Sequence, residues 1–199
     1  MTLASEPRPD SRAALRETLG RETDTFRTRV RDLLDSHSHV PAEKTRTRRE
    51  IRRRLDTDPE AVTFDGWEEI DRHSRPLAWQ AWVLDHAPLG ITLTGAAYHD
   101  NQIRYANLAF QELTGYGPAT LSGANPRFLQ TEETDEERRA DFVEALRTWE
   151  PVTVEIHNER ADGRPFSNRV SLVPVAGADG TVEHWFGIQA AVAWPAGRP

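Results

Sequence analysis

Hydrophobic and polar positions divide the 199-residue chain into a helical N-terminal part and a strand-rich C-terminal part. Within residues 11–35, buried-type positions recur at steps of three and four, which predicts one amphipathic helix; they are Leu15, Leu19, Thr23, Phe26, Val30 and Leu33. A stripe this thin is typical of a two-helix or dimeric seam, and a helix packed on its own domain explains it equally well. Residues 77–90, LAWQAWVLDHAPLG, predict a second, short helix.

From residue 90 the pattern changes to the alternation of half-buried strands. Five segments show it: GITLTG (90–95), IRYAN (103–107), VTVEIHNER (152–160), PFSNRVSLVPV (165–175) and TVEHWFGIQAAVAW (181–194). Between them, residues 108–123 predict short helical turns and residues 134–150 a longer capped helix. This order predicts an α+β domain with a five-stranded antiparallel sheet and short helices, preceded by a helical N-terminal region.

Composition excludes several classes of function. The chain contains no cysteine, which excludes disulfides, thiolate metal sites and cysteine nucleophiles. His37 and His39 form the only close histidine pair, without the further ligands that a metal site needs. No nucleophile, base and orienting group stand together, so we expect a protein that is not an enzyme. No apolar run reaches the roughly 18 residues of a membrane span, and no signal peptide is apparent, so we expect a cytoplasmic protein with no membrane contact.

Two neighbouring segments carry opposite charge. Residues 43–54 hold seven basic and two acidic side chains, whereas residues 56–71 hold seven acidic side chains and no basic one. The basic segment invites contact with nucleic acid, but a net charge of -7 argues against general polyanion binding. The two segments can instead satisfy each other within the fold or across a dimer. We expect a homodimer through the N-terminal helices and keep nucleic acid as the lesser alternative.

Three amide side chains share the inward face of the last three predicted strands, namely those of Asn158, Asn168 and Gln189. A buried amide without a partner costs roughly 1–3 kcal/mol, so several on one face suggest a ligand that donates and accepts hydrogen bonds. The pyrimidine edge of a flavin has this character, and Gly187 would leave room for a flat ring. Amides that pair with one another or cap strand ends explain the same pattern.

Residues 90–192 resemble the light-oxygen-voltage (LOV) family of PAS domains. The matching motifs run in order without insertion: NQIRYANLAFQELTGY, GANPRFLQ, ETD, HNERADGRPFSN and FGIQ. The resemblance implies a PAS-type fold with FMN bound, and it leaves FAD or riboflavin open. It implies that the polar edge, flank and phosphate of the flavin are held by Asn125, Asn158, Asn168, Gln189, Gln130 and Arg127. It further implies a pocket lined by Thr94, Asn101, Leu129 and Leu172.

The chain departs from the family pattern at two positions. Pro126 occupies the place of the photoactive cysteine, which excludes the cysteinyl adduct, although proline is compatible with the start of a short helix. Val143 stands where the family often has a second phosphate-binding arginine; Arg139, one turn earlier, is the candidate replacement.

The resemblance without the thiol implies a blue-light or redox sensor. It would signal by photoreduction of the flavin to the neutral semiquinone, with Gln189 reorienting toward the N-terminal helices. Trp185 is the nearest candidate electron donor, and Tyr116 or an external reductant are the alternatives. The alternatives are a PAS interaction module with a structural or non-flavin ligand and a DNA-binding transcriptional regulator. Only a short segment follows the last strand, so we expect the output to lie in residues 1–75 and flavin binding to need only residues 76–199.

Overall fold

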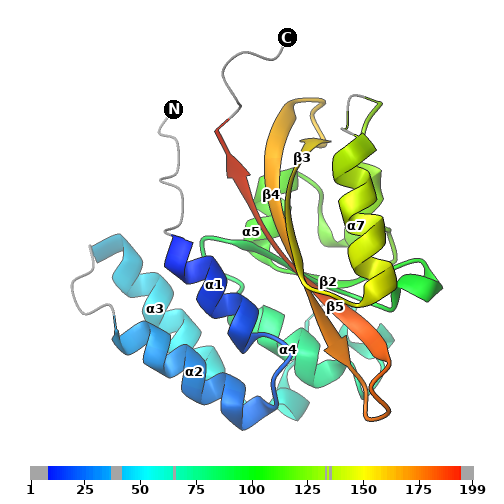
Figure 1. Cartoon of the computed structure of the whole chain (residues 1–199). Coiled ribbons are helices and arrows are strands. Elements are labelled where there is room, and N and C mark those ends of the chain that lie inside the picture. The colour runs from blue at the N-terminus through cyan, green and yellow to red at the C-terminus, as the bar shows by residue number, and fades with distance from the viewer. Residues whose placement is uncertain (1–8, 37–41, 65, 133, 135, 194–199) are drawn as a thin grey trace.

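The computed structural model describes residues 9–36, 42–64, 66–132, 134 and 136–193. A central antiparallel sheet has the N-terminal helices on one side and α7 on the other (Figure 1). The strands are β1 (Gly90–Thr94), β2 (Ile103–Ala106), β3 (Val152–Glu159), β4 (Pro165–Ala176) and β5 (Val182–Val192), in the spatial order β2-β1-β5-β4-β3. The predicted α+β fold with a five-stranded PAS-type sheet is therefore confirmed, and each strand lies where the alternation placed it.

Helices occupy both the N-terminal part and the connections of the sheet. The N-terminal part contains α1 (Pro9–Thr18), α2 (Thr23–Asp35), α3 (Ala42–Leu55) and α4 (Arg75–Val83), with 3-10 turns η1 (Pro59–Ala61) and η2 (Trp67–Glu69). The sheet connections hold η3 (Ala97–His99), α5 (Leu108–Thr114), α6 (Pro118–Leu121), η4 (Pro126–Leu129) and α7 (Glu136–Thr148). Both α5 and η4 begin at asparagine caps, since Asn107 and Asn125 accept hydrogen bonds from the first turns.

The prediction of one helix over residues 11–35 is wrong, because the chain breaks between α1 and α2. Gly20 adopts a left-handed conformation with φ of +77°, which an L side chain rarely adopts. Its N–H donates to Gln80 Oε1 at 2.9 Å, and Gln80 Nε2 donates to the carbonyl of Arg21 at 2.7 Å. The break thus lets both helices bury apolar residues, Leu15 in α1 and Phe26 in α2, while α4 holds the turn.

The two faces of the sheet have different roles. The helix face carries Leu93, Phe186 and Ile188, which are fully buried in one apolar cluster with residues of α1, α2, α3 and α4. The opposite face, called the amide face below, carries Asn158, Asn168 and Gln189. Because the cluster joins the N-terminal helices to the sheet, the two regions share a core, and the domain boundary at residue 75 stays a prediction.

A buried ion pair ties α3 to the sheet. Arg54 Nη1 donates to Asp85 Oδ2 at 2.9 Å and to the carbonyl of Trp82 at 2.6 Å, and its guanidinium lies over the Trp82 ring. The other oxygen of Asp85 accepts from the Tyr105 hydroxyl and from the Leu108 N–H, each at 3.0 Å. Burial first, then the charge of Asp85, raises the pKa of Tyr105 strongly, which keeps its hydroxyl a donor. Through these interactions of Asp85, α3 is connected with β2 and with the start of α5.

Candidate functional site on the amide face

Asn158, Asn168 and Gln189 are brought together on β3, β4 and β5. Register places Asn168 opposite Ile156, and Gln189 opposite Val170, so the three amides stand on adjacent strands of one face. Asn168 Nδ2 donates to Asn158 Oδ1 at 2.9 Å and to Gln189 Oε1 at 2.8 Å. All three side chains are buried. The inward position and grouping expected from strand alternation are therefore what the structure shows.

One atom of this amide cluster lacks a partner. Asn168 is fully buried, and its Oδ1 has no hydrogen-bond donor among the residues that the structure describes. Leaving a buried acceptor unpaired costs roughly 1–3 kcal/mol, and native proteins rarely tolerate it without a reason. A ligand that presents an N–H to this oxygen would remove the cost, and the N3–H of a flavin pyrimidine edge is such a donor.

Gly187 keeps the backbone of β5 bare beside the amides. It lies opposite Leu172 on β4 and opposite Thr92 on β1. A Cβ at residue 187 would lie 2.5 Å from Thr92 Oγ1 and 3.3 Å from Gln189 Nε2, so a side chain would collide with the row of polar groups. Glycine thus lets Thr92 and Gln189 approach the β5 backbone closely. The unpaired acceptor of Asn168 and the linked amides around it fit the polar edge of a flavin.

The predicted phosphate residue Arg127 lies on the surface in an ion pair. Its Nη1 contacts Asp100 Oδ1 at 2.7 Å, with about 60% of both side chains exposed (63% and 56%). Asn125 Nδ2 also donates to Asp100, to its carbonyl and its carboxylate, while Asn125 Oδ1 caps η4 by accepting from the Arg127 N–H at 2.9 Å. The left-handed backbone of Asp100, with φ of 63°, presents these acceptors. Sequence reasoning missed Asp100, although the YHDN turn signal contained it.

The remaining predicted residues divide between buried and exposed places. Thr94 is buried and its hydroxyl donates to Asn101 Oδ1 at 2.6 Å; Leu129 is buried in a second apolar cluster with Ile103, Phe110 and Leu121. Gln130 ends η4 and, like Leu172, is half-buried. Arg139 and Val143 are exposed on α7. Trp185 is buried opposite Thr94, and its indole Nε1 has no acceptor within the described part of the chain.

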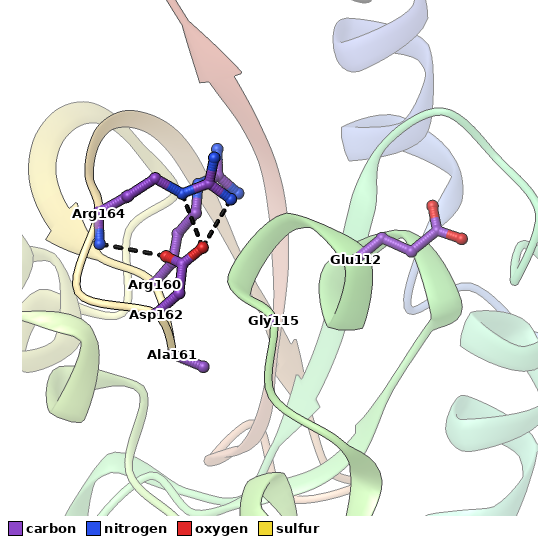
Figure 2. A pocket seen from close by; sticks show the side chains of 6 residues that line it. All are labelled: Glu112, Gly115, Arg160, Ala161, Asp162 and Arg164. Carbon is purple, nitrogen blue, oxygen red and sulfur yellow. Dashed lines mark hydrogen bonds and ion pairs between the residues drawn. The ribbon is translucent and has the colours of Figure 1, made fainter.

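A cavity of about 450 Å³ opens between the end of α5 and the β3–β4 hairpin (Figure 2). It is lined by Glu112, Gly115, Arg160, Ala161, Asp162 and Arg164, none of which was predicted to bind the cofactor. Arg164 contacts the Asp162 carboxylate at 2.6 and 2.7 Å, whereas Arg160 lies over the Phe166 ring. Burial first, then the charge of Arg164, lowers the pKa of Arg160. The cavity has cationic and anionic walls and lies outside the amide cluster.

The fold and the amide face now allow comparison with known proteins. A PAS domain profile matches residues 88–189. The chain belongs to the PAS domain family. Among solved structures, this PAS domain is similar to the LOV domain of a blue-light-activated histidine kinase from Erythrobacter litoralis, with 34% identity and a TM-score of 0.51 over 54% of this chain and 98% of that one. It is also similar to the Aureochrome1 LOV domain in its light state, with 32% identity and a TM-score of 0.51 over 55% and 86% of the two chains.

Curated relatives extend the comparison to longer proteins. The bacterioopsin transcriptional activator of Halobacterium salinarum is 42% identical over 107 residues, which are 54% of this chain and 16% of that protein. Blue-light-activated histidine kinase 2 of Erythrobacter litoralis is 34% identical over 110 residues, 55% of this chain and 31% of the kinase. This chain thus spans less than a third of either relative. The PAS domain closely matches LOV photoreceptor domains, but the chain contains no cysteine.

No helix in the described ranges is both long and apolar enough to cross a membrane. The same residues contain no group of histidine and carboxylate side chains suited to a metal ion. His37 and His39 lie outside the described residues.

Proposed function

We propose that this PAS domain binds a flavin noncovalently on its amide face and acts as a blue-light or redox sensor. The observation that carries the proposal is the buried, unpartnered Oδ1 of Asn168 within the linked amides of Asn158 and Gln189. A flavin would supply blue-light absorption and one-electron redox chemistry. Since the chain has no cysteine, a thiol adduct is excluded, and light would act by reduction of the bound flavin, with Trp185, Tyr116 or an external reductant as the electron donor. The role is one of sensing, not catalysis.

Asn158, Asn168 and Gln189 would hold the polar edge of the ring, and Thr94, Leu129, Gln130 and Leu172 would line its surroundings. FMN is the proposed form; FAD or riboflavin are the alternatives. Arg127 would hold the phosphate after exchanging its contact with Asp100, an exposed pair of the kind that costs little to break. Arg139 is exposed on α7 and is the proposed second phosphate contact.

The amide cluster itself suggests how a change at Gln189 spreads. Gln189 Oε1 now accepts from Asn168 Nδ2. If the Gln189 amide reverses, two N–H groups face each other, so Asn168 must turn as well or β4 and β5 must shift. A turn of Asn168 removes the donor from Asn158 Oδ1 in the same step. The reorientation therefore involves three strands, because the amides form one directional chain.

The test is the absorption spectrum of the purified protein, followed by reconstitution with FMN, FAD and riboflavin and by mass spectrometry of the released cofactor. Asn168→Leu should lose the bound flavin, whereas Ser167→Ala, on the helix face of the same strand, should keep it. Blue light with a reductant should bleach the blue absorption band reversibly in air and give no thiol-adduct band. Protein that stays colourless after reconstitution contradicts the proposal and favours a PAS module with another ligand.

For the output we propose a homodimer through the N-terminal helices, and DNA binding is the second candidate. Arg46 and Arg49 are exposed on α3 and make no ion pair within the residues described, unlike Arg52, which contacts Asp35. A relative that matches this PAS domain is named a transcriptional activator. Light scattering on an Arg46→Gln/Arg49→Gln variant tests the dimer. Salt-dependent retention on double-stranded DNA, lost in that variant, would favour the second candidate.

A further inference from the structure

Arg12 of α1 contacts the sheet directly behind the amide cluster. Its Nη1 donates to the carbonyl of Ile188 on β5 at 2.6 Å and to the carbonyl of Arg169 on β4 at 3.0 Å; Ser171 Oγ lies 3.4 Å away. Ile188 precedes Gln189, and Arg169 follows Asn168. The paired strands β4 and β5 are thus bridged twice at the same level: on the amide face by the Asn168–Gln189 hydrogen bond, and on the helix face by Arg12.

The two bridges are mechanically linked through the backbone. The Ile188 carbonyl and the Cα of Gln189 belong to one planar peptide unit, so the carbonyl oxygen moves whenever that Cα is displaced. The Gln189 side chain points to the amide face, whereas the Ile188 carbonyl lies in the plane of the sheet and is reached by Arg12 from the helix face. The short bond from a charged donor is the stronger kind, so the guanidinium follows the carbonyl or loses the contact.

From Arg12 the connection continues into the helical region. Leu15 of α1 and Leu19 directly after it are buried in the shared core, and the Gly20 N–H donates to Gln80 of α4. We propose that Arg12 is the positioning residue that passes the state of the Asn168–Gln189 pair to α1 and, through Gln80, to α4. Its role as a signalling contact rests on the proposed sensor function, while the coupling itself exists with or without a flavin.

The experiment is hydrogen exchange on the full chain, with and without added FMN, in a cycle of variants. Gln189→Leu breaks the amide bridge, and Arg12→Gln removes the charged donor. Arg16→Gln is the matched control, because Arg16 lies one turn later on α1 and donates to the Thr153 hydroxyl on β3 at 3.4 Å, away from Ile188 and Arg169. We expect Gln189→Leu to speed exchange of α1 amides roughly fivefold or more in the wild-type and Arg16→Gln backgrounds, the usual size of coupling between sites. In the Arg12→Gln background the further change should disappear.

An equal response of α1 to Gln189→Leu in the Arg12→Gln and Arg16→Gln backgrounds would overturn the proposal. Should Arg12→Gln also unprotect β1, the sheet itself is loosened, and Arg12→Met, which keeps an unbranched stem but has no N–H donor, replaces it under the same criterion. Protein that binds no flavin but shows the coupling refutes the sensor function and leaves the Arg12 contact standing. Protein that binds flavin but shows no coupling refutes the role of Arg12 and leaves the sensor function standing.

Discussion

Asn168 donates its amide N–H to Gln189 at 2.8 Å, while the oxygen of the same amide is fully buried and faces no donor in the described residues. A pair that is bonded on one side and unsatisfied on the other is suited to a bound ligand that donates a hydrogen bond. The first prediction follows from that asymmetry.

FMN should stabilise the wild-type protein through Asn168. A ligand at 100 times its Kd stabilises the folded state by about 2.7 kcal/mol. Asn168→Leu should lose most of that thermal shift, and Ser167→Ala, on the opposite face of β4, should keep it. Differential scanning fluorimetry over a range of FMN concentrations measures both. An undiminished shift in Asn168→Leu would place the ligand elsewhere.

Asp100 should compete with the FMN phosphate for Arg127. The two side chains form an exposed ion pair at 2.7 Å. Asp100→Asn should free Arg127 and tighten FMN relative to riboflavin, which lacks the phosphate. Arg127→Ala should weaken FMN by about 1.5–3 kcal/mol, the size of a charge-assisted hydrogen bond, and leave riboflavin unchanged. Calorimetric titration measures the affinity of each variant for both flavins. An equal loss of affinity for FMN and riboflavin in Arg127→Ala would show that Arg127 is not at the phosphate.

Breaking the Arg54–Asp85 pair should destabilise the fold strongly. Both side chains are about 10% exposed, and removal of one partner from a buried ion pair costs about 3–5 kcal/mol. Asp85→Leu should therefore lower the urea midpoint sharply. The control is Asp56→Ala, whose pair with Arg31 is exposed and worth about 0–1 kcal/mol. The double variant Arg54→Met/Asp85→Leu should recover part of the loss, because the Tyr105 hydroxyl and the Leu108 N–H still lack their acceptor. A midpoint no better than that of the single variant would contradict this.

Stability should fall with pH below about 6.5 because of His184. Its imidazole contacts the buried Ser74 hydroxyl at 2.7 Å. Burial is the main cause that lowers the pKa of His184, and the charge of Arg104 lowers it further. The charges of Asp71 and Glu183 raise this pKa but do not outweigh burial. The unfolded chain takes up the proton near 6.5, but the folded chain takes it up only at lower pH. The stabilisation is thus complete above about 6.5 and declines from there down to the folded pKa.

Urea unfolding between pH 5 and 8 tests this. His184→Gln should flatten the profile in that window, while His99→Gln, an exposed histidine on η3, should leave it unchanged. Asp71 adds a separate decline of stability at lower pH. Burial raises the pKa of Asp71, but the hydrogen bonds from Ser74 and His73 together outweigh burial, so the pKa is lowered. The stabilisation from Asp71 is therefore lost as the pH falls below about 3.8. A profile for His184→Gln that matches the wild type would assign the decline to other groups.

Removal of residues 1–75 should expose the helix face. Phe26, Leu55 and Trp67 lie in the same buried cluster as Leu93 and Phe186. Burial of apolar surface contributes roughly 25 cal/mol per Å², so a sheet without these helices loses much of its stabilisation. This shared core argues against the expectation from the sequence that residues 76–199 suffice for flavin binding. We therefore expect the fragment 76–199 to aggregate or to melt at lower temperature than the full chain, by light scattering and circular dichroism. A soluble fragment with unchanged melting would show that residues 76–199 fold alone.

The sequence by itself determined the strands, the grouping of the three amides and the absence of adduct chemistry. Alternation with period two assigns Asn158, Asn168 and Gln189 to one face wherever the strands pair in register, and composition alone excludes a thiol. Periodicity did not reveal the break at Gly20, because the apolar steps continue across it and its left-handed turn is held by Gln80 sixty residues away. Long-range contacts needed the tertiary structure: Arg127 with Asp100, Arg54 with Asp85, and Arg12 behind Gln189. A charged side chain has many candidate partners along a chain this rich in arginine and acidic residues, and only the packing of helices against the sheet selects one.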